Sequence, residues 1–456
     1  MLVTSKFRSQ WIIRVAALFL VAFLSASAVS GYSVLTHEEI IDLAWTGDLR
    51  PLLLQRFPGL TEKQITEAHA YAYGGAVIQD LGYYPFGDTE FSDLVHYVRS
   101  GDFVRELLLE SQDANEYAFA LGALAHYTSD IDGHPAVNQA VAIQYPKLKL
   151  KFGNSIRYAQ DHTAHLKTEF GFDMVQVAKN RYASQQYHDF IGFQVSKSLL
   201  ERVFPIVYGV ELNEVLPHED LAIGSYRYSV SRLIPEMTQV ALRTHKKDMM
   251  RETPGFAKRK FLYRLSRSEY EKNWGKDFPT PGVGTRTMSA VLHYMPKVGP
   301  FKAMAFNTPT AQTEEMYFKS INLSVDQYRV FLKEVRSDSV VLPNFDLDSG
   351  KATQAAEYSL TDEAYAKLLG QLAARKFDLT SADLRINILQ FYSDLSAPIE
   401  TKKDEGRWRS VVTSLDQLKS VNNVPAVADN SPGRAPVALD EVITAPGPGS
   451  SATATQ

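Results

Sequence analysis

The chain has 456 residues, of which 45% are hydrophobic and 22% charged, so it is long enough for a large core and for two or three domains. Its net charge of −4 does not argue for a nucleic-acid binder, and the absence of cysteine excludes disulfides, thiolate zinc ligands and a cysteine nucleophile. Any metal must therefore be held by His, Asp, Glu, backbone groups or water. The 11 histidines are few enough for clustering among them to be informative.

The first 31 residues are typical of an export signal peptide. Basic residues precede the apolar run AALFLVAFL at 16–24, and small residues follow in SASAVSG. The run is shorter than the roughly 20 residues that span a bilayer, and an uncleaved membrane anchor is the alternative. Cleavage after Ala28, Ser30 or Gly31 would each leave a small residue at the −1 position. The sequence thus predicts an exported protein, either secreted or periplasmic.

Helical periodicity dominates the part of the chain that follows. Apolar residues recur at three- and four-residue spacing, which predicts an all-α fold, in 38–45, 103–127, 187–204 and 226–250. Strand-like alternation bounded by hairpin turns is rare. The stretch GGAVIQDLGYYPFGD at 74–88 predicts a helix end followed by a loop, and DGHP predicts that the helix through His126 ends near Gly133.

The composition changes beyond about residue 250. KDFPTPGVGTRT at 276–287 predicts a linker or a long loop, and helical patterns then return at 325–335, 361–377 and 381–395. This part contains few histidines and no cluster of residues that suggests chemistry. Residues 251–420 are therefore predicted as a helical accessory region. Residues 421–456 contain several prolines and no aromatic residue, which predicts a disordered tail.

The stretch LGALAHYTSDIDGHP places His126, Asp130 and His134 four residues apart in an apolar, alanine-rich run. Residues at this spacing lie about 40° from one another around a helix, so all three would share one face. Burying three ionisable groups there without partners would cost several kcal/mol if they were charged. The face is therefore either a stabilised polar seam or part of a metal site.

Other histidines and carboxylates in the same half of the chain extend this pattern: His37, Asp80, His96, His165 and Glu169. Taken alone, a histidine on such a helix is usually an ordinary core or surface residue, and a His-x3-Glu pair usually lies on a solvated helix face. Together they offer eight side chains of the kinds that zinc accepts without cysteine. Eight ligands are too many for one tetrahedral ion and enough for two or three.

The order of these residues resembles the zinc-dependent phospholipase C family, an all-helical exported fold shared with secreted three-zinc single-strand nucleases. The family pattern runs from an aromatic N-terminal residue to a late His-x3-acid pair, and this chain offers Tyr32, His37, Asp80, His96, His126, Asp130, His134, His165 and Glu169 in that order. The resemblance covers roughly 32–250. It implies a catalytic domain of this class, followed by the helical extension and the tail.

The resemblance also implies which residues would hold three zinc ions. The ligand sets would be Asp80, His96, His126 and Asp130; then Asp130, His37 and the free amino group and carbonyl of Tyr32 as first residue; then His134, His165 and Glu169. Cleavage behind Gly31 would create the terminal ligand. The chain departs from the family pattern in having Tyr32 where Trp is usual, and in a spacing from Asp130 to His134 that is two residues shorter than usual.

The reaction implied is metal-assisted hydrolysis of a phosphodiester by a zinc-activated water, with Asp80 as the catalytic residue that orients or deprotonates it. As a phospholipase C, the protein would cleave the glycerol-side phosphate ester of a phospholipid. The alternatives are a single-strand-specific zinc nuclease and a non-catalytic zinc-stabilised binding protein.

Aromatic residues near Asp80 are candidates for substrate binding. Tyr83, Tyr84 and Phe86 would cradle a cationic head group, stack on bases or simply pack the fold. The expected substrate is a phospholipid or another phosphodiester. Contact with a membrane surface is open, no specific nucleic-acid partner is expected, and no protein partner can be inferred.

Overall fold

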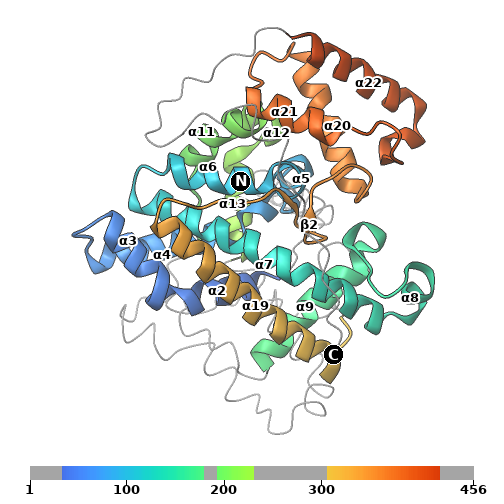
Figure 1. Ribbon diagram of the computed structural model, residues 1–456. Helices are drawn as coiled ribbons and strands as arrows, with labels where there is room; N and C mark the ends of the chain where they lie inside the picture. The colour runs from blue at the N-terminus through green and yellow to red at the C-terminus, as the bar shows by residue number, and fades with distance from the viewer. Residues whose placement is uncertain (1–32, 179–192, 231–305, 422–456) are drawn as a thin grey trace, which may run out of the picture.

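The structure, a computed structural model, describes residues 33–178, 193–230 and 306–421. Within these ranges the fold is all-α, as predicted, with one small two-stranded ribbon (Figure 1). The predicted signal peptide, Tyr32, the predicted linker and nearly all of the predicted tail lie outside the described residues. None of the helices in the described ranges has the length and apolar character that crossing a bilayer requires.

The first two described ranges build a helical bundle. Its α-helices are α2 (Val34–Ala44), α3 (Arg50–Arg56), α4 (Glu62–Ala76), α5 (Thr89–Tyr97), α6 (Ser100–Glu110), α7 (Ala114–Gln144), α8 (Pro146–Phe152), α9 (His162–Ala178), α11 (Lys197–Tyr208), α12 (Leu212–Val215) and α13 (Glu219–Tyr228). Shorter turns are the π-helix η1 (Trp45–Leu49) and the 3-10 helices η2 (Ile78–Tyr83) and η3 (Tyr158–Gln160). As predicted, α4 ends within the glycine-containing stretch 74–88, but η2 occupies much of the expected loop.

Helix α7 forms the centre of this bundle and carries the predicted His-x3-Asp-x3-His face. All residues from 116 to 130 are buried, because α2, α4, α6, α9 and α19 surround the helix. Its N-terminus is capped by Asp113, whose carboxylate accepts the backbone N–H groups of Asn115 and Glu116. This cap separates α7 from α6, so the helical pattern over 103–127 belongs to two helices.

The expected helix end near Gly133 is also wrong. Helix α7 continues to Gln144 with Pro135 inside it, so His126, Asp130 and His134 all lie on the same continuous helix. A proline cannot donate to the carbonyl four residues earlier, and this usually breaks a helix. Here the helix is held on all sides by its neighbours, and packing outweighs the local preference.

Glycines allow α4 and α7 to approach closely. A Cβ built on Gly122 would lie 2.1 Å from the carbonyl oxygen of Ala72, and one on Gly75 would lie 1.9 Å from that of Phe119. Since the obstructing atoms belong to the backbone, they cannot rotate away. The two helices can therefore hold this separation only with glycine at the contact.

We expect Gly122→Ala to lower the free energy of unfolding by about 3 kcal/mol, the upper range for overpacking a core. Gly224→Ala is the matched control, because a Cβ there would meet nothing within 4 Å and the residue lies inside α13. That control should stabilise the protein by roughly 0.5–1 kcal/mol through helix propensity. Urea unfolding followed by circular dichroism measures both, and equal stabilities would contradict the prediction.

The third described range returns to the bundle. It comprises α19 (Ala311–Arg336), the antiparallel pair β1 (Phe345–Asp346) and β2 (Lys351–Ala352), α20 (Ser359–Ala374), α21 (Ala382–Phe391), the 3-10 helix η6 (Glu400–Lys403) and α22 (Glu405–Ser420). Helix α19 lies along α7, where the hydroxyl of Tyr328 donates to the carbonyl of Leu121 at 2.8 Å (Figure 1).

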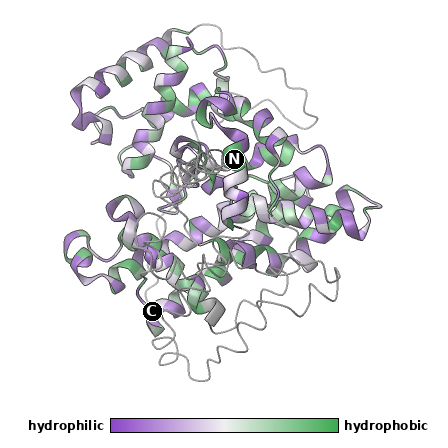
Figure 2. Cartoon of the chain, turned by 180° about the vertical axis from the view of Figure 1, so that it is seen from behind, coloured by the Kyte–Doolittle hydropathy of each residue, from purple (hydrophilic) through white to green (hydrophobic). Residues whose placement is uncertain are grey.

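Residues beyond 306 share one hydrophobic core with the bundle. Helix α20 packs against α5 as well as against α22, and β1 contacts both α5 and α6. Figure 2 shows hydrophilic and hydrophobic residues interspersed along the helices, as expected for amphipathic helices that bury one face. The C-terminal helices therefore complete the core around the elements that carry the predicted ligands.

Candidate metal centre

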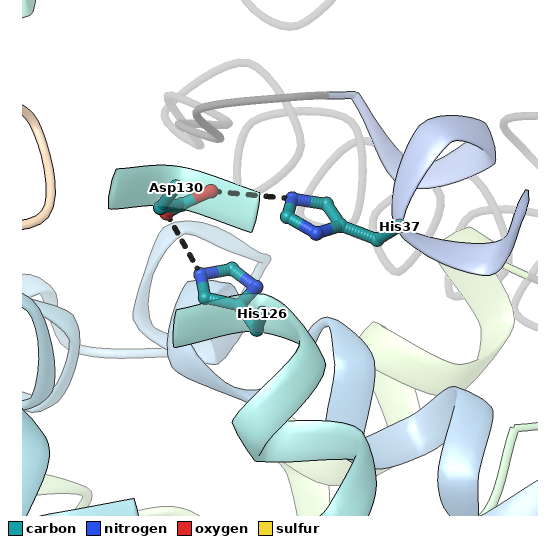
Figure 3. Close-up of side chains that lie close together, drawn as sticks. All are labelled: His37, His126 and Asp130. Atoms are coloured by element: carbon teal, nitrogen blue, oxygen red, sulfur yellow. Dashed lines mark ion pairs between the residues drawn. The ribbon is translucent and has the colours of Figure 1, made fainter. Parts of the chain in front are cut away.

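Asp130 lies at the centre of a group of imidazoles from three helices. Its Oδ2 is 3.0 Å from Nε2 of His126 and 3.6 Å from Nε2 of both His96 and His134. Its Oδ1 is 3.6 Å from Nε2 of His37, which reaches in from α2 (Figure 3). All five side chains are buried. Four predicted ligands that are far apart in sequence thus converge on the carboxylate predicted to bridge two metals.

The distances in this group fit those expected between ligands of one metal ion. Asp80, from the turn η2, places Oδ1 3.5 Å from Nε2 of His96. Separations of 3.5–3.6 Å are too long for hydrogen bonds. Two nitrogen or oxygen ligands of a tetrahedral zinc ion, each at about 2.1 Å, lie about 3.4 Å apart. The spacing of Asp80, His96 and Asp130 therefore fits metal coordination better than direct hydrogen bonding.

Hydrogen bonds to the backbone orient two of the imidazoles. Nδ1 of His96 donates to the carbonyl of Ser92 at 2.8 Å, and Nδ1 of His126 donates to the carbonyl of Ala76 at 2.9 Å. Because a carbonyl can only accept, Nδ1 carries the proton in both rings and Nε2 is the nitrogen left for a metal. These two Nε2 atoms lie 3.4 Å apart and both face Asp130.

His37 is oriented in the same way, through a hydroxyl. Its Nδ1 lies 2.9 Å from Oγ of Ser129, and that hydroxyl donates to the carbonyl of His126 at 2.9 Å. Since the hydroxyl proton is used on the carbonyl, the oxygen accepts from Nδ1–H of His37. The Nε2 atom of His37 therefore faces Asp130 with its lone pair, and the ring stacks on His126 with centroids 4.4 Å apart.

Buried polar atoms without hydrogen-bond partners gather at the same place. Within the described residues, neither carboxylate oxygen of Asp80 or Asp130 accepts a hydrogen bond, and neither ring nitrogen of His134 makes one. Buried polar groups without partners cost about 1–3 kcal/mol each, and more when charged, so native proteins rarely leave them. Their concentration here, among imidazoles and carboxylates alone, fits zinc well.

Burial and charge act against each other on the titrating groups. Burial raises the pKa of Asp80. Burial would also raise the pKa of Asp130, but the neighbouring His126 and His134 hold it well below its usual range. For His134, burial would lower the pKa, yet the carboxylates of Asp348 and Asp130 raise it to about 9. Asp130 is thus ionised at neutral pH, which is the form that binds a cation.

Two sets of residues have ligand atoms that all lie within 4.8 Å of one another: His37, His126 and Asp130, and Asp80, His96 and His126. The group with His37 overlaps the second predicted zinc set, for which His126 was not predicted, and the group with Asp80 falls within the first. Among the described residues, the third predicted set of His134, His165 and Glu169 does not form such a group.

His165 and Glu169 lie on one face of α9, as their spacing predicts, and they bond to each other. Nδ1 of His165 is 2.5 Å from Oε1 of Glu169, while Nε2 is 2.8 Å from Oδ1 of Asn138. The ring of His165 stacks 5.5 Å from that of His134. Burial lowers the pKa of His165 to about 3 and raises that of Glu169 well above its usual range. Both members of the pair are therefore neutral, with Glu169 orienting the ring.

One acidic residue at the site comes from the C-terminal region. Asp348 is buried, and its Oδ1 lies 3.6 Å from Nε2 of His134. Nothing in the sequence singles out Asp348, because PNFDLDSG contains no histidine and lies more than 170 residues beyond the last predicted ligand. The only local signal is a pair of aspartates before a glycine, which is common in turns.

The predicted substrate-binding aromatic residues lie close to the site but are mostly enclosed. Tyr83 is 5% exposed, with its ring centroid 6.0 Å from that of His96. Tyr84 packs edge-on against Tyr226 at 5.2 Å. Phe86 is partly exposed and has a left-handed backbone with φ of 66°. Contact of these three side chains with a substrate stays a prediction, and Tyr32 lies outside the described residues.

The fold and this centre together describe an all-α protein whose buried histidine–aspartate clusters fit zinc binding. Comparison with protein families identifies it further, since residues 36–216 match the zinc-dependent phospholipase C family. The matched residues contain the predicted ligands from His37 to Glu169, so the match agrees with the resemblance that the motifs indicated. No curated protein and no solved structure gave a match. The family match ends before α13, so Asp348 lies well outside it.

Proposed function

We propose that this protein is an exported phospholipase C that hydrolyses the glycerol-side phosphate ester of phospholipids. The observation that carries the proposal is the convergence of four imidazoles on Asp130, with Asp80 beside His96, in a domain of the zinc-dependent phospholipase C family. The products would be diacylglycerol and a phosphorylated head group. A phospholipid substrate is consistent with the family.

Zinc bound at such a centre supplies a Lewis acid for the phosphate and lowers the pKa of a bound water to about 7. The chain's own part is to position the reacting groups. Asp80 has a pKa raised by burial, and neither of its oxygens accepts a hydrogen bond within the described residues. A carboxylate of this kind is basic enough to orient the attacking water and take its proton. The fixed rings of His96 and His126 keep that geometry rigid.

Export would complete the centre by freeing an α-amino group near α2. The first turn of α2 is fixed to α9, because the carboxylate of Asp173 accepts the backbone N–H of Leu35 at 3.1 Å and the hydroxyl of Thr36 at 2.7 Å. Cleavage behind Gly31 would start the mature chain two residues before α2, whose His37 faces Asp130. This arrangement supports a role for the mature N-terminus as a ligand, while a count of three zinc ions rests on the resemblance alone.

The decisive experiment offers the purified, processed protein two substrates, phosphatidylcholine vesicles and single-stranded DNA. We expect release of diacylglycerol and phosphocholine, and Asp80→Asn should reduce the rate by about 10²–10⁴-fold through loss of general-base assistance. Release of nucleotides without diacylglycerol would instead identify a nuclease. Inactivity of zinc-loaded protein on both of these and on vesicles of other phospholipids would identify a non-catalytic zinc-stabilised binding protein.

A further inference from the structure

The segment 343–350, outside the family match, is bound tightly to the elements that carry the metal ligands. It is hydrogen-bonded to α7 through the hydroxyl of Tyr127, which donates to the carbonyl of Pro343 at 2.5 Å. Three bonds join it to α6: the N–H groups of Gly101 and Asp102 donate to Oδ1 of Asn344 at 3.0 and 3.1 Å, and the hydroxyl of Ser100 donates to the carbonyl of Phe345 at 2.6 Å. On α5, the carbonyl of His96 accepts from the N–H of Leu347 at 3.2 Å. The last contact joins the segment to the backbone of a predicted ligand. The segment therefore has a fixed position relative to the metal centre.

The end of this segment fits against the proline in α7. Because Pro135 has no N–H, it cannot donate to the carbonyl of Ile131. Gly350 approaches this carbonyl so closely that a Cβ would lie 2.4 Å from its oxygen and 3.1 Å from Cγ of Pro135. Gly350 also has φ of +67°, which favours glycine. Pro135 and Gly350, which lie far apart in the sequence, thus place this loop beside His134.

Asp348 is held so that one of its oxygens faces the centre. Its Oδ2 accepts hydrogen bonds from the hydroxyls of Tyr97 at 2.9 Å and Tyr358 at 2.6 Å. Its backbone carbonyl accepts from Nδ2 of Asn138 at 3.0 Å. Its Oδ1 is buried, makes no hydrogen bond within the described residues and lies 3.6 Å from Nε2 of His134. This combination of one anchored and one open oxygen is typical of a monodentate metal ligand.

We propose that Asp348 is a metal ligand that shares an ion with His134, so that the C-terminal region completes the metal centre of the family domain. The distance from Oδ1 of Asp348 to Nε2 of His134 matches that of the other histidine–aspartate pairs of this centre, which are 3.5–3.6 Å. Only the His126–Asp130 pair is closer. The inference rests on the proposed function only in that these residues hold zinc. It assigns to the region beyond the family match a direct part in the site.

Asp348→Asn tests this directly, because asparagine keeps an oxygen for Tyr97 and Tyr358 but can present an amide N–H₂ to the metal position. Zinc bound per chain, measured by elemental mass spectrometry after dialysis, should fall by one equivalent relative to the wild type. The dissociation constant of that ion should rise by at least ~100-fold, the upper end of the effect of losing a supporting residue. Asp346→Asn is the matched control, since Asp346 is equally buried but bonds to Thr361 and Ser349.

A second variant keeps the test independent of how well the first one folds. The chain has no cysteine, so Asp348→Cys introduces its only thiol, and in the cobalt-loaded protein it should give a thiolate-to-cobalt charge-transfer band. Asp346→Cys should give none. Full zinc content in folded Asp348→Asn, or no band in Asp348→Cys, would overturn the assignment. A wild-type protein that binds no zinc would instead defeat the proposed function itself.

Discussion

Replacing Asp130 with asparagine should release two zinc ions together and slow phosphodiester hydrolysis by at least ~10³-fold, which corresponds to about 4 kcal/mol of transition-state stabilisation. The reason is that both oxygens of Asp130 face imidazoles, with Oδ1 toward His37 and Oδ2 toward His96, His126 and His134. A neutral amide removes the shared negative charge and turns one donor group toward the metal positions. Zinc content and diacylglycerol release from the same preparation measure both effects.

Asp132→Asn is the matched control for this change. Asp132 lies two residues further along α7, is only partly buried and is absent from both groups of mutually close ligand atoms. It should keep the wild-type zinc content and rate. If Asp130→Asn lost a single equivalent of zinc, Asp130 would not be a bridging ligand. If it lost none, the centre would not be organised around this carboxylate at all.

Much of this centre could be predicted from the sequence because most of its predicted ligands lie on α-helices. Spacing by four residues on one helix fixes His126, Asp130 and His134 on one face, whatever surrounds them. The helix nevertheless continues through Pro135, which local preference alone does not predict. The helices packed around α7 override that preference. They include α19, and segment 343–350 packs against Pro135 itself, so these contacts come from parts of the chain far away in sequence.

The part of the site that could not be predicted depends on contacts between distant segments. The helical spacing of His165 and Glu169 is the same whether both side chains bind a metal or form the hydrogen bond seen between them in this structure. Asp348 has no spacing relationship with any histidine, and only the packing of β1 against α5 and α6 brings it to His134. Periodicity predicts which face of a helix or strand is buried, but it does not predict which side chains from distant parts of the chain will contact that face.

Removing zinc should abolish hydrolysis and also destabilise the fold. The carboxylates of Asp80 and Asp130 are buried without hydrogen-bond donors within the described residues. A bound cation would offset the free-energy cost of burying them. At free zinc concentrations about 100 times the dissociation constant, each ion contributes about 2.7 kcal/mol, hence about 5 kcal/mol for two ions. At about 2 °C per kcal/mol, we expect chelation to lower Tm by ~10 °C. Differential scanning calorimetry with and without chelator measures this shift.

The same comparison in Asp130→Asn separates metal loss from other effects of the chelator. Because this variant is expected to lack two of the ions already, chelation should lower its Tm by much less than it lowers that of the wild type. Adding zinc back should restore both Tm and hydrolysis in the wild type, whereas magnesium, which prefers octahedral oxygen ligands, should restore neither. An unchanged Tm after metal loss confirmed by mass spectrometry would contradict this prediction. It would mean that other groups of the protein offset the cost of burying Asp80 and Asp130.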